Sequence, residues 1–152
     1  MNKLNNKTGF TLVELLVVIV IIGILATLAT VALSSAREKA RDARRISDIK
    51  QTQTALELYF NDNQNYPSTN LNAQLLSIAF GTRLASYLPA TPADPLTSDC
   101  STYTGYKYTA RDADGLASTG ATPPSYSIEY CLKGTTGQIS AGWHTASTRG
   151  IK

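Results

Sequence analysis

The chain has 152 residues, with 14 basic and 11 acidic side chains and two cysteines. This size suits one small domain plus an N-terminal element. Residues 1–45 hold seven of the basic and three of the acidic groups, so residues 46–152 are close to neutral. A near-neutral globular part argues against a general nucleic-acid-binding surface and leaves room only for a local patch.

A short, mostly polar stretch at residues 1–9 precedes an apolar run at residues 10–33, which has no proline and a single charge, Glu14. A membrane-spanning helix needs about 20 apolar residues, whereas a secretory signal peptide has an apolar core of about 7–15 residues. The run therefore predicts a membrane helix. A signal peptide and an uncut anchor are the alternatives, and neither gives Glu14 a role.

Glu14 needs a partner, because a carboxylate inside a bilayer is costly unless it is paired. No basic side chain lies on its helix face within two turns. Cleavage between Gly9 and Phe10 would create an α-amino group one helical turn before it. We therefore expect the Phe10 amine to pair with Glu14 of the same or a neighbouring subunit, which would set the axial register of packed helices.

The residues from Gly9 to Ile19 resemble the cleavage segment of type IV pilins and of the pseudopilins of type II secretion. In these families glycine precedes the cut, phenylalanine comes first and glutamate fifth. The resemblance implies a leader at residues 1–9, cleavage after Gly9 by a membrane prepilin peptidase, and N-methylation of Phe10. It also implies assembly through Glu14 into a helical homo-oligomeric filament, by an assembly ATPase and a platform protein.

The same resemblance places the precursor in the inner (cytoplasmic) membrane, with its C-terminal domain outside the cytoplasm and the assembled filament outside the cell. Basic residues after the apolar run outnumber those before it, and a positive-inside count alone would give the opposite orientation. We follow the resemblance, because cleavage in this family occurs on the cytoplasmic face and two cysteines suit an oxidising compartment.

Helical periodicity continues beyond the apolar run. Apolar residues recur at steps of three or four up to Phe60, and stop signals begin at residues 61–67. We predict one helix from about Phe10 to about Phe60, membrane- or filament-embedded over 10–33 and followed by an amphipathic part, 34–62. The predicted buried stripe of this second part comprises Ala36, Ala40, Ala43, Ile46, Ile49, Gln53, Leu56 and Phe60.

Charged side chains alternate in sign between Arg37 and Asp48. On a helix, pairs at spacings of three or four then mix attraction and repulsion. We expect this stretch to be a solvated helix face that contacts lipid headgroups before assembly. Bridges to neighbouring subunits are the alternative.

Residues 63–152 are predicted to form a globular domain, with short helical pieces over 71–88 and a proline-rich connector over 89–95. The expected buried residues of the helical pieces are Leu75, Leu76, Ile78, Ala79, Leu84 and Leu88. Alternating apolar and polar residues predict three strands, at Tyr106–Ala110, Tyr126–Leu132 and Gln138–Trp143. The fold class is therefore α+β, a long N-terminal helix packed on a small antiparallel sheet, which is also the pilin-like fold.

The two cysteines, Cys100 and Cys131, lie in the predicted globular domain. If this domain is outside the cytoplasm, a disulfide between them is expected, and free buried thiols are the alternative. A hairpin folded at Gly115 and Leu116 would place residues whose numbers sum to about 231 opposite one another, as the two cysteine numbers do. We therefore expect the disulfide to close the base of this hairpin.

No pattern typical of a catalytic site is present. His144 is the only histidine, and we expect it to lie at the surface or at a sheet edge. Because the chain also lacks a nucleophile elbow, a phosphate loop and a His/Cys cluster, we predict that it is not an enzyme and has no cofactor. Calcium is the one alternative: Asp112 and Asp114 before Gly115 could begin a calcium loop, with oxygens from Ser118 and Thr119, but Asp-Gly is also common in turns.

These observations predict a structural subunit of a type IV pilus-like filament. One alternative is a pseudopilin of a type II secretion or DNA-uptake system. The alternative from another class is a membrane-tethered ligand-binding module at a filament tip.

Overall fold

The computed structural model describes residues 9–69, 73–100 and 104–151. The chain divides into two compact units, residues 1–37 and residues 38–152. Helix α1, Leu12–Asn63, begins in the first unit and ends in the second. Its bounds lie within three residues of the predicted helix. It ends where Gln64 takes a left-handed conformation, with a φ of 58°, which stops the helical hydrogen-bond pattern.

The large apolar side chains of the first unit are exposed. Between Leu12 and Leu33 their exposed fractions run from 87% at Leu12 down to 47% at Val18. The helix is long and apolar enough to cross a membrane, by length and composition. A continuous exposed apolar surface of this kind is typical of a segment that contacts a membrane or another protein.

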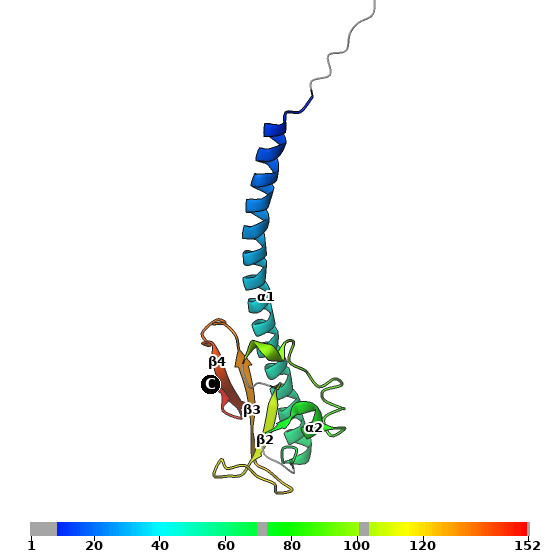
Figure 1. The fold of residues 1–152 in the computed structure, drawn as a ribbon. Coiled ribbons are helices and arrows are strands. Elements are labelled where there is room, and N and C mark those ends of the chain that lie inside the picture. The colour runs from blue at the N-terminus through cyan, green and yellow to red at the C-terminus, as the bar shows by residue number, and fades with distance from the viewer. Residues whose placement is uncertain (1–8, 70–72, 101–103, 152) are drawn as a thin grey trace, which may run out of the picture. The chain divides into compact units, whose positions relative to one another are not determined.

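The second unit contains a five-stranded antiparallel sheet in the order β1-β2-β3-β4-β5 (Figure 1). Its strands are β1 Gln74–Leu75, β2 Lys107–Arg111, β3 Ser125–Leu132, β4 Gly142–Ser147 and β5 Gly150–Ile151. A short helix α2, Leu76–Phe80, follows β1, and a 3-10 turn η1, Thr97–Asp99, precedes β2. The predicted α+β class, with a long helix on a small antiparallel sheet, is thus confirmed.

One face of the sheet supplies the core. Alternate residues of the central strands point towards the second half of α1, as the period of two in a strand requires. The core joins them to apolar residues of both helices, and its completely buried members are Ile49, Leu56, Tyr108, Ala110, Ile128, Tyr130 and Ala146. The part of α1 from Ile46 to Phe60 is thus fixed to the sheet by burial of apolar surface.

The β2–β3 register differs from the predicted one. Lys107 pairs with Glu129 and Ala110 with Tyr126, so the numbers of paired residues sum to 236 and not to 231. The turn at Gly115 is not the apex of this hairpin, because the amide of Ser118 bonds to the carbonyl of Ala110 at 2.8 Å and folds the turn back onto the end of β2. This extra turn shifts the β2–β3 register by five residues from the predicted one.

Two further predictions about the domain were wrong in detail. The third predicted strand lies later, at β4, because Ile139 instead pairs with Thr136 in a tight turn. Ile78 was expected to be buried, but it is 65% exposed on the outer side of α2, whereas Leu76 and Ala79 are buried. The short strands β1 and β5 were not predicted, because two residues carry no periodic signal.

The packing of Ile128 can be tested against that of Ile78. Ile128 is completely buried in the core, so Ile128→Ala should lower the free energy of unfolding by about 2–5 kcal/mol. The exposed Ile78→Ala should change it by less than about 0.5 kcal/mol. Urea unfolding of the detergent-solubilised chain, followed by tryptophan fluorescence, measures both. Equal effects of the two substitutions would contradict the described core.

Candidate functional site

The predicted cleavage point lies just before α1. Gly9 and Phe10 have no regular secondary structure, and Phe10 is 85% exposed. Both positions are thus outside the hydrogen-bonded helix, where a protease can reach the peptide bond between them.

Glu14 has a local partner that the sequence reasoning missed. Its Oε2 accepts hydrogen bonds from the backbone amide and the hydroxyl of Thr11, both at 2.8 Å. In return the Thr11 hydroxyl accepts from the Glu14 amide at 3.2 Å. This reciprocal arrangement is a capping box, and its signature Thr-x-x-Glu is visible in the sequence. It explains why the helix begins at Leu12, and it leaves Glu14 Oε1 without a hydrogen bond among the described residues.

The disulfide between Cys100 and Cys131 is confirmed, with Cα atoms 6.5 Å apart. Its position differs from the predicted hairpin base. Cys100 follows η1, before β2 begins, while Cys131 lies on β3 and faces Trp143 of β4. The bond therefore ties the segment before β2 to the C-terminal end of the central strand β3.

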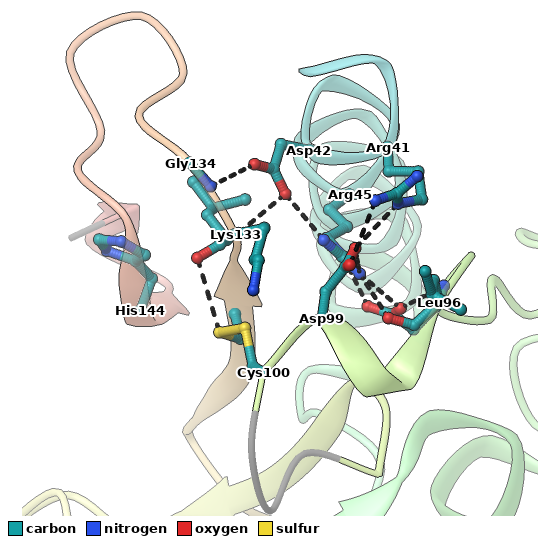
Figure 2. Close-up of a disulfide and its surroundings, with 12 residues drawn as sticks. Arg41, Asp42, Arg45, Leu96, Asp99, Cys100, Lys133, Gly134 and His144 are labelled. Atoms are coloured by element: carbon teal, nitrogen blue, oxygen red, sulfur yellow. Dashed lines mark hydrogen bonds and ion pairs between the residues drawn. A yellow bond between two sulfur atoms is a disulfide. The ribbon is translucent and has the colours of Figure 1, made fainter. Parts of the chain in front are cut away.

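A buried arginine, Arg45, lies at the centre of a charged cluster, and Figure 2 shows it between Asp42 and Asp99. The cluster also includes Asp94. The side chain of Arg45 is completely buried. Its Nε and Nη2 form a fork on Asp94, at 2.8 and 2.9 Å. Nη1 donates to Asp42 at 2.7 Å, and Nη2 also donates to Asp99 at 3.0 Å and to the carbonyl of Leu96 at 2.8 Å. In the structure the connector continues beyond the predicted range 89–95 through η1 to Cys100, and helix α1 is thereby attached to it.

Asp42 extends the cluster to the far end of β3. Its two carboxylate oxygens accept hydrogen bonds from the backbone amides of Lys133 at 3.0 Å and Gly134 at 2.7 Å (Figure 2). A Cβ atom at Gly134 would lie 3.1 Å from Oε1 of Glu38, so glycine allows the backbone to approach the helix closely. Arg41 completes the cluster, with Nε 2.8 Å from Oδ2 of Asp99.

The prediction that the charges between Arg37 and Asp48 form a solvated face was therefore wrong for three of these eight charged residues. Asp42, Arg45 and Asp48 are buried, whereas Ala40 and Ala43 of the predicted stripe are exposed. The physical reason is that the connector supplies counter-charges 49 and 54 residues away in the sequence. The i,i+3 spacing of Asp42 and Arg45 was a visible signal, but it did not reveal the distant partners.

Opposite charges in the cluster stabilise the ionised forms of Asp99 and Arg45. Burial disfavours the ionised form of Asp99, but hydrogen bonds from Arg41 and Arg45, together with their positive charge, outweigh burial and hold the pKa of Asp99 below its ordinary value. Burial likewise opposes the charge of Arg45, yet its bonds to Asp94 and Asp42 raise its pKa. These contacts thus favour the ionised forms of Asp99 and Arg45 in the folded state.

The other predicted site residues lie elsewhere. Oδ1 of Asp112 accepts a hydrogen bond from the Leu116 amide at 2.8 Å, and Gly115 has a φ of 80°, so this segment is a turn. Asp114 is exposed, and no group of three or more His, Cys, Asp or Glu among the described residues could hold a metal ion. Calcium binding stays a prediction. His144 lies on β4, with Nε2 2.8 Å from the carbonyl of Ser140.

Comparison with known proteins places these features in context. Residues 4–30 match the family model of the prokaryotic N-terminal methylation motif. The chain is 38% identical over 106 residues to the type II secretion system core protein G of Escherichia coli K12, covering 65% of this chain and 73% of the relative. It is 35% identical over 105 residues to the core protein G of Vibrio cholerae, covering 65% and 72%. No solved structure matches the chain.

Removal of the Arg45 side-chain charge should strongly destabilise the globular unit. Arg45→Met leaves buried carboxylates without their cation, so we expect the free energy of unfolding to fall by about 3–5 kcal/mol. Arg44→Met is the matched control. Arg44 is 66% exposed and 3.9 Å from Asp48, and its loss should cost less than about 1 kcal/mol. Urea unfolding distinguishes the two, and an equal cost would show that Arg45 contributes no more than a surface charge.

The lowered pKa of Asp99 predicts a pH dependence. The folded chain binds fewer protons at this carboxyl than the unfolded chain, whose Asp pKa is about 3.9. Its contribution to stability is therefore complete above that value and is lost as the pH falls through the folded pKa. Asp99→Asn should be less stable at neutral pH and lose less stability on acidification. Urea unfolding over a pH series measures this, and parallel curves for both chains would contradict it.

Proposed function

The chain belongs to the family of the type II secretion system core protein G, and from that premise we propose that it is a pseudopilin, a structural subunit of a short secretion filament. It carries the N-terminal methylation motif of pilins and pseudopilins, which are structural proteins and not enzymes. A type IV pilus remains the alternative within this wider family. The relatives favour the pseudopilin, because both are type II secretion proteins.

The observation that carries the proposal is the exposed apolar surface of α1 between Leu12 and Leu33, with one carboxylate near its start. Such a surface is covered either by lipid or by the same surface of other copies. We propose that it first anchors the precursor in the inner membrane. The helix then leaves the lipid for the centre of a filament made of many copies.

Glu14 has two distinct roles in this mechanism. Within one chain its Oε2 caps the start of α1 through Thr11. Cleavage after Gly9 would leave that cap intact and create a cationic amine at Phe10, and we propose that Oε1 receives this amine from a neighbouring copy. The pairing neutralises both charges among apolar helices, where an unpaired carboxylate is costly.

The proposed partners follow from the same sequence of events. A prepilin peptidase cuts after Gly9 and N-methylates Phe10, and an assembly ATPase with its platform protein moves each subunit into the filament. The globular unit remains outside the cytoplasm. A membrane-tethered ligand-binding module has no specific observation in its favour.

The two roles of Glu14 can be separated by substitution. Glu14→Gln keeps an oxygen that can accept a hydrogen bond from the Thr11 amide, so the substitution preserves the capping box but removes the charge. Thr11→Ala removes the capping hydroxyl and keeps the charge. In a strain lacking the wild-type gene, we expect Glu14→Gln to abolish release of cleaved subunits by shearing and to retain secretion substrates in the cell. Thr11→Ala should largely preserve both.

Mass measurement of each variant controls for cleavage after Gly9. If Glu14→Gln assembles as well as the wild type while Thr11→Ala fails, capping and not charge pairing is the essential role. If sheared filaments disappear but secretion continues, the chain is a pilus subunit and the pseudopilin proposal is wrong.

A further inference from the structure

The connector between α2 and β2 has few attachments to the rest of the second unit. Residues 94–100 contribute no strand to the sheet, and η1 contains no buried residue. Among the described residues, the side-chain contacts that hold this segment are the bonds from Arg41 and Arg45 and the disulfide at Cys100. Its position therefore depends on one ionic and one covalent attachment.

The two attachments meet at Asp99 and Cys100, which are neighbours in the chain. Asp99 faces Arg45, and Cys100 is bonded to Cys131 of β3 (Figure 2). Two residues after Cys131, the amide of Lys133 bonds to Asp42, and Asp42 bonds to Arg45. The contacts thus form a closed ring from α1 through the connector and β3 back to α1.

The disulfide is part of an open cavity. A hollow of about 570 Å³ is lined by both cysteines together with Asp99, Lys133 and Trp143. Cys100 is half-buried. Thiol–disulfide exchange requires a thiolate to reach a sulfur atom, and this hollow supplies an approach from solvent.

We propose that the Cys100–Cys131 disulfide is a redox-dependent clamp that completes the charged cluster around Arg45. In the reduced chain, the connector keeps only its ionic attachments, and ordering it costs conformational entropy. Oxidation joins the two sulfur atoms and holds Asp99 within reach of both arginines. The globular unit thus reaches its final connector geometry only after oxidation.

The oxidation step is a dithiol–disulfide exchange with a disulfide of an oxidoreductase or a small molecule. The thiols of Cys100 and Cys131 together lose two electrons and two protons, and the reacting disulfide is reduced to two thiols. A mixed disulfide with one cysteine is the intermediate, and the second cysteine displaces the leaving thiol.

A double-mutant cycle tests whether the disulfide and the ionic contacts are coupled. The four full-length chains are wild type, Asp99→Asn, Cys100→Ser with Cys131→Ser, and the combination of all three substitutions. We expect Asp99→Asn to lower the thermal midpoint clearly in the oxidised chain and only slightly in the serine background. Arg83→Gln is the matched control, because Arg83 bonds to the carbonyl of Ser68 outside the cluster, and its effect should be the same in both backgrounds.

Hydrogen exchange locates the effect and remains informative if a serine variant folds poorly. Reduction of the wild-type chain under native conditions should speed exchange of the hydrogen-bonded amides in the segment 96–100, those of Leu96 and Asp99, by about tenfold or more and leave β2 and β3 protected. Reoxidation with oxidised glutathione should restore the slow rate. Unchanged exchange at 96–100, loss of protection throughout the sheet, or an equal effect of Asp99→Asn in both backgrounds would each overturn the proposal.

Discussion

The geometry of the globular unit depends on the burial of one guanidinium group. Arg45 has no exposed side-chain surface and makes its bonds to Asp42, Asp94 and Asp99. An unpaired charge in this position would be strongly unfavourable, so the connector must approach α1. Through Asp42 the same cluster holds the backbone at Gly134. Burial of apolar side chains attaches the sheet to α1. The charged cluster then fixes the positions of the connector and of the backbone after β3 against the same helix.

The first unit follows a different rule. The large apolar side chains between Leu12 and Leu33 are exposed, and Glu14, the only charged residue of that stretch, is already hydrogen-bonded in the capping box with Thr11. We propose that the stability of this helix comes from its surroundings, first from lipid and then from other copies of the chain. In this proposal the one chain combines a domain held by internal contacts with a helix whose contacts are intermolecular.

Local patterns in the sequence predicted the parts of the structure that local forces determine. The steps of three and four residues predicted α1, and the alternation around Tyr108 and Ile128 predicted the central strands. The motif from Gly9 to Glu14 predicted the family and the candidate assembly site. What could not be predicted depends on distant partners: Asp94 lies 49 residues from Arg45, and the turn beyond Ala110 displaces β3. The capping box of Thr11 and Glu14 is also a local pattern, but the prediction treated Glu14 only as a charge that needs a cationic partner and did not include its hydrogen bonds to Thr11.

The most direct measurement is the side-chain proton exchange of Arg45 in solution. In a nitrogen-15 spectrum of the detergent-solubilised chain, the Nε–H of Arg45 should exchange slowly and persist at mildly alkaline pH, because it is buried and bonded to Asp94. The Nε–H of the exposed Arg44 should disappear under the same conditions. Equally fast exchange at both arginines would contradict the account, since Arg45 would then be solvated and the connector would not be held against α1.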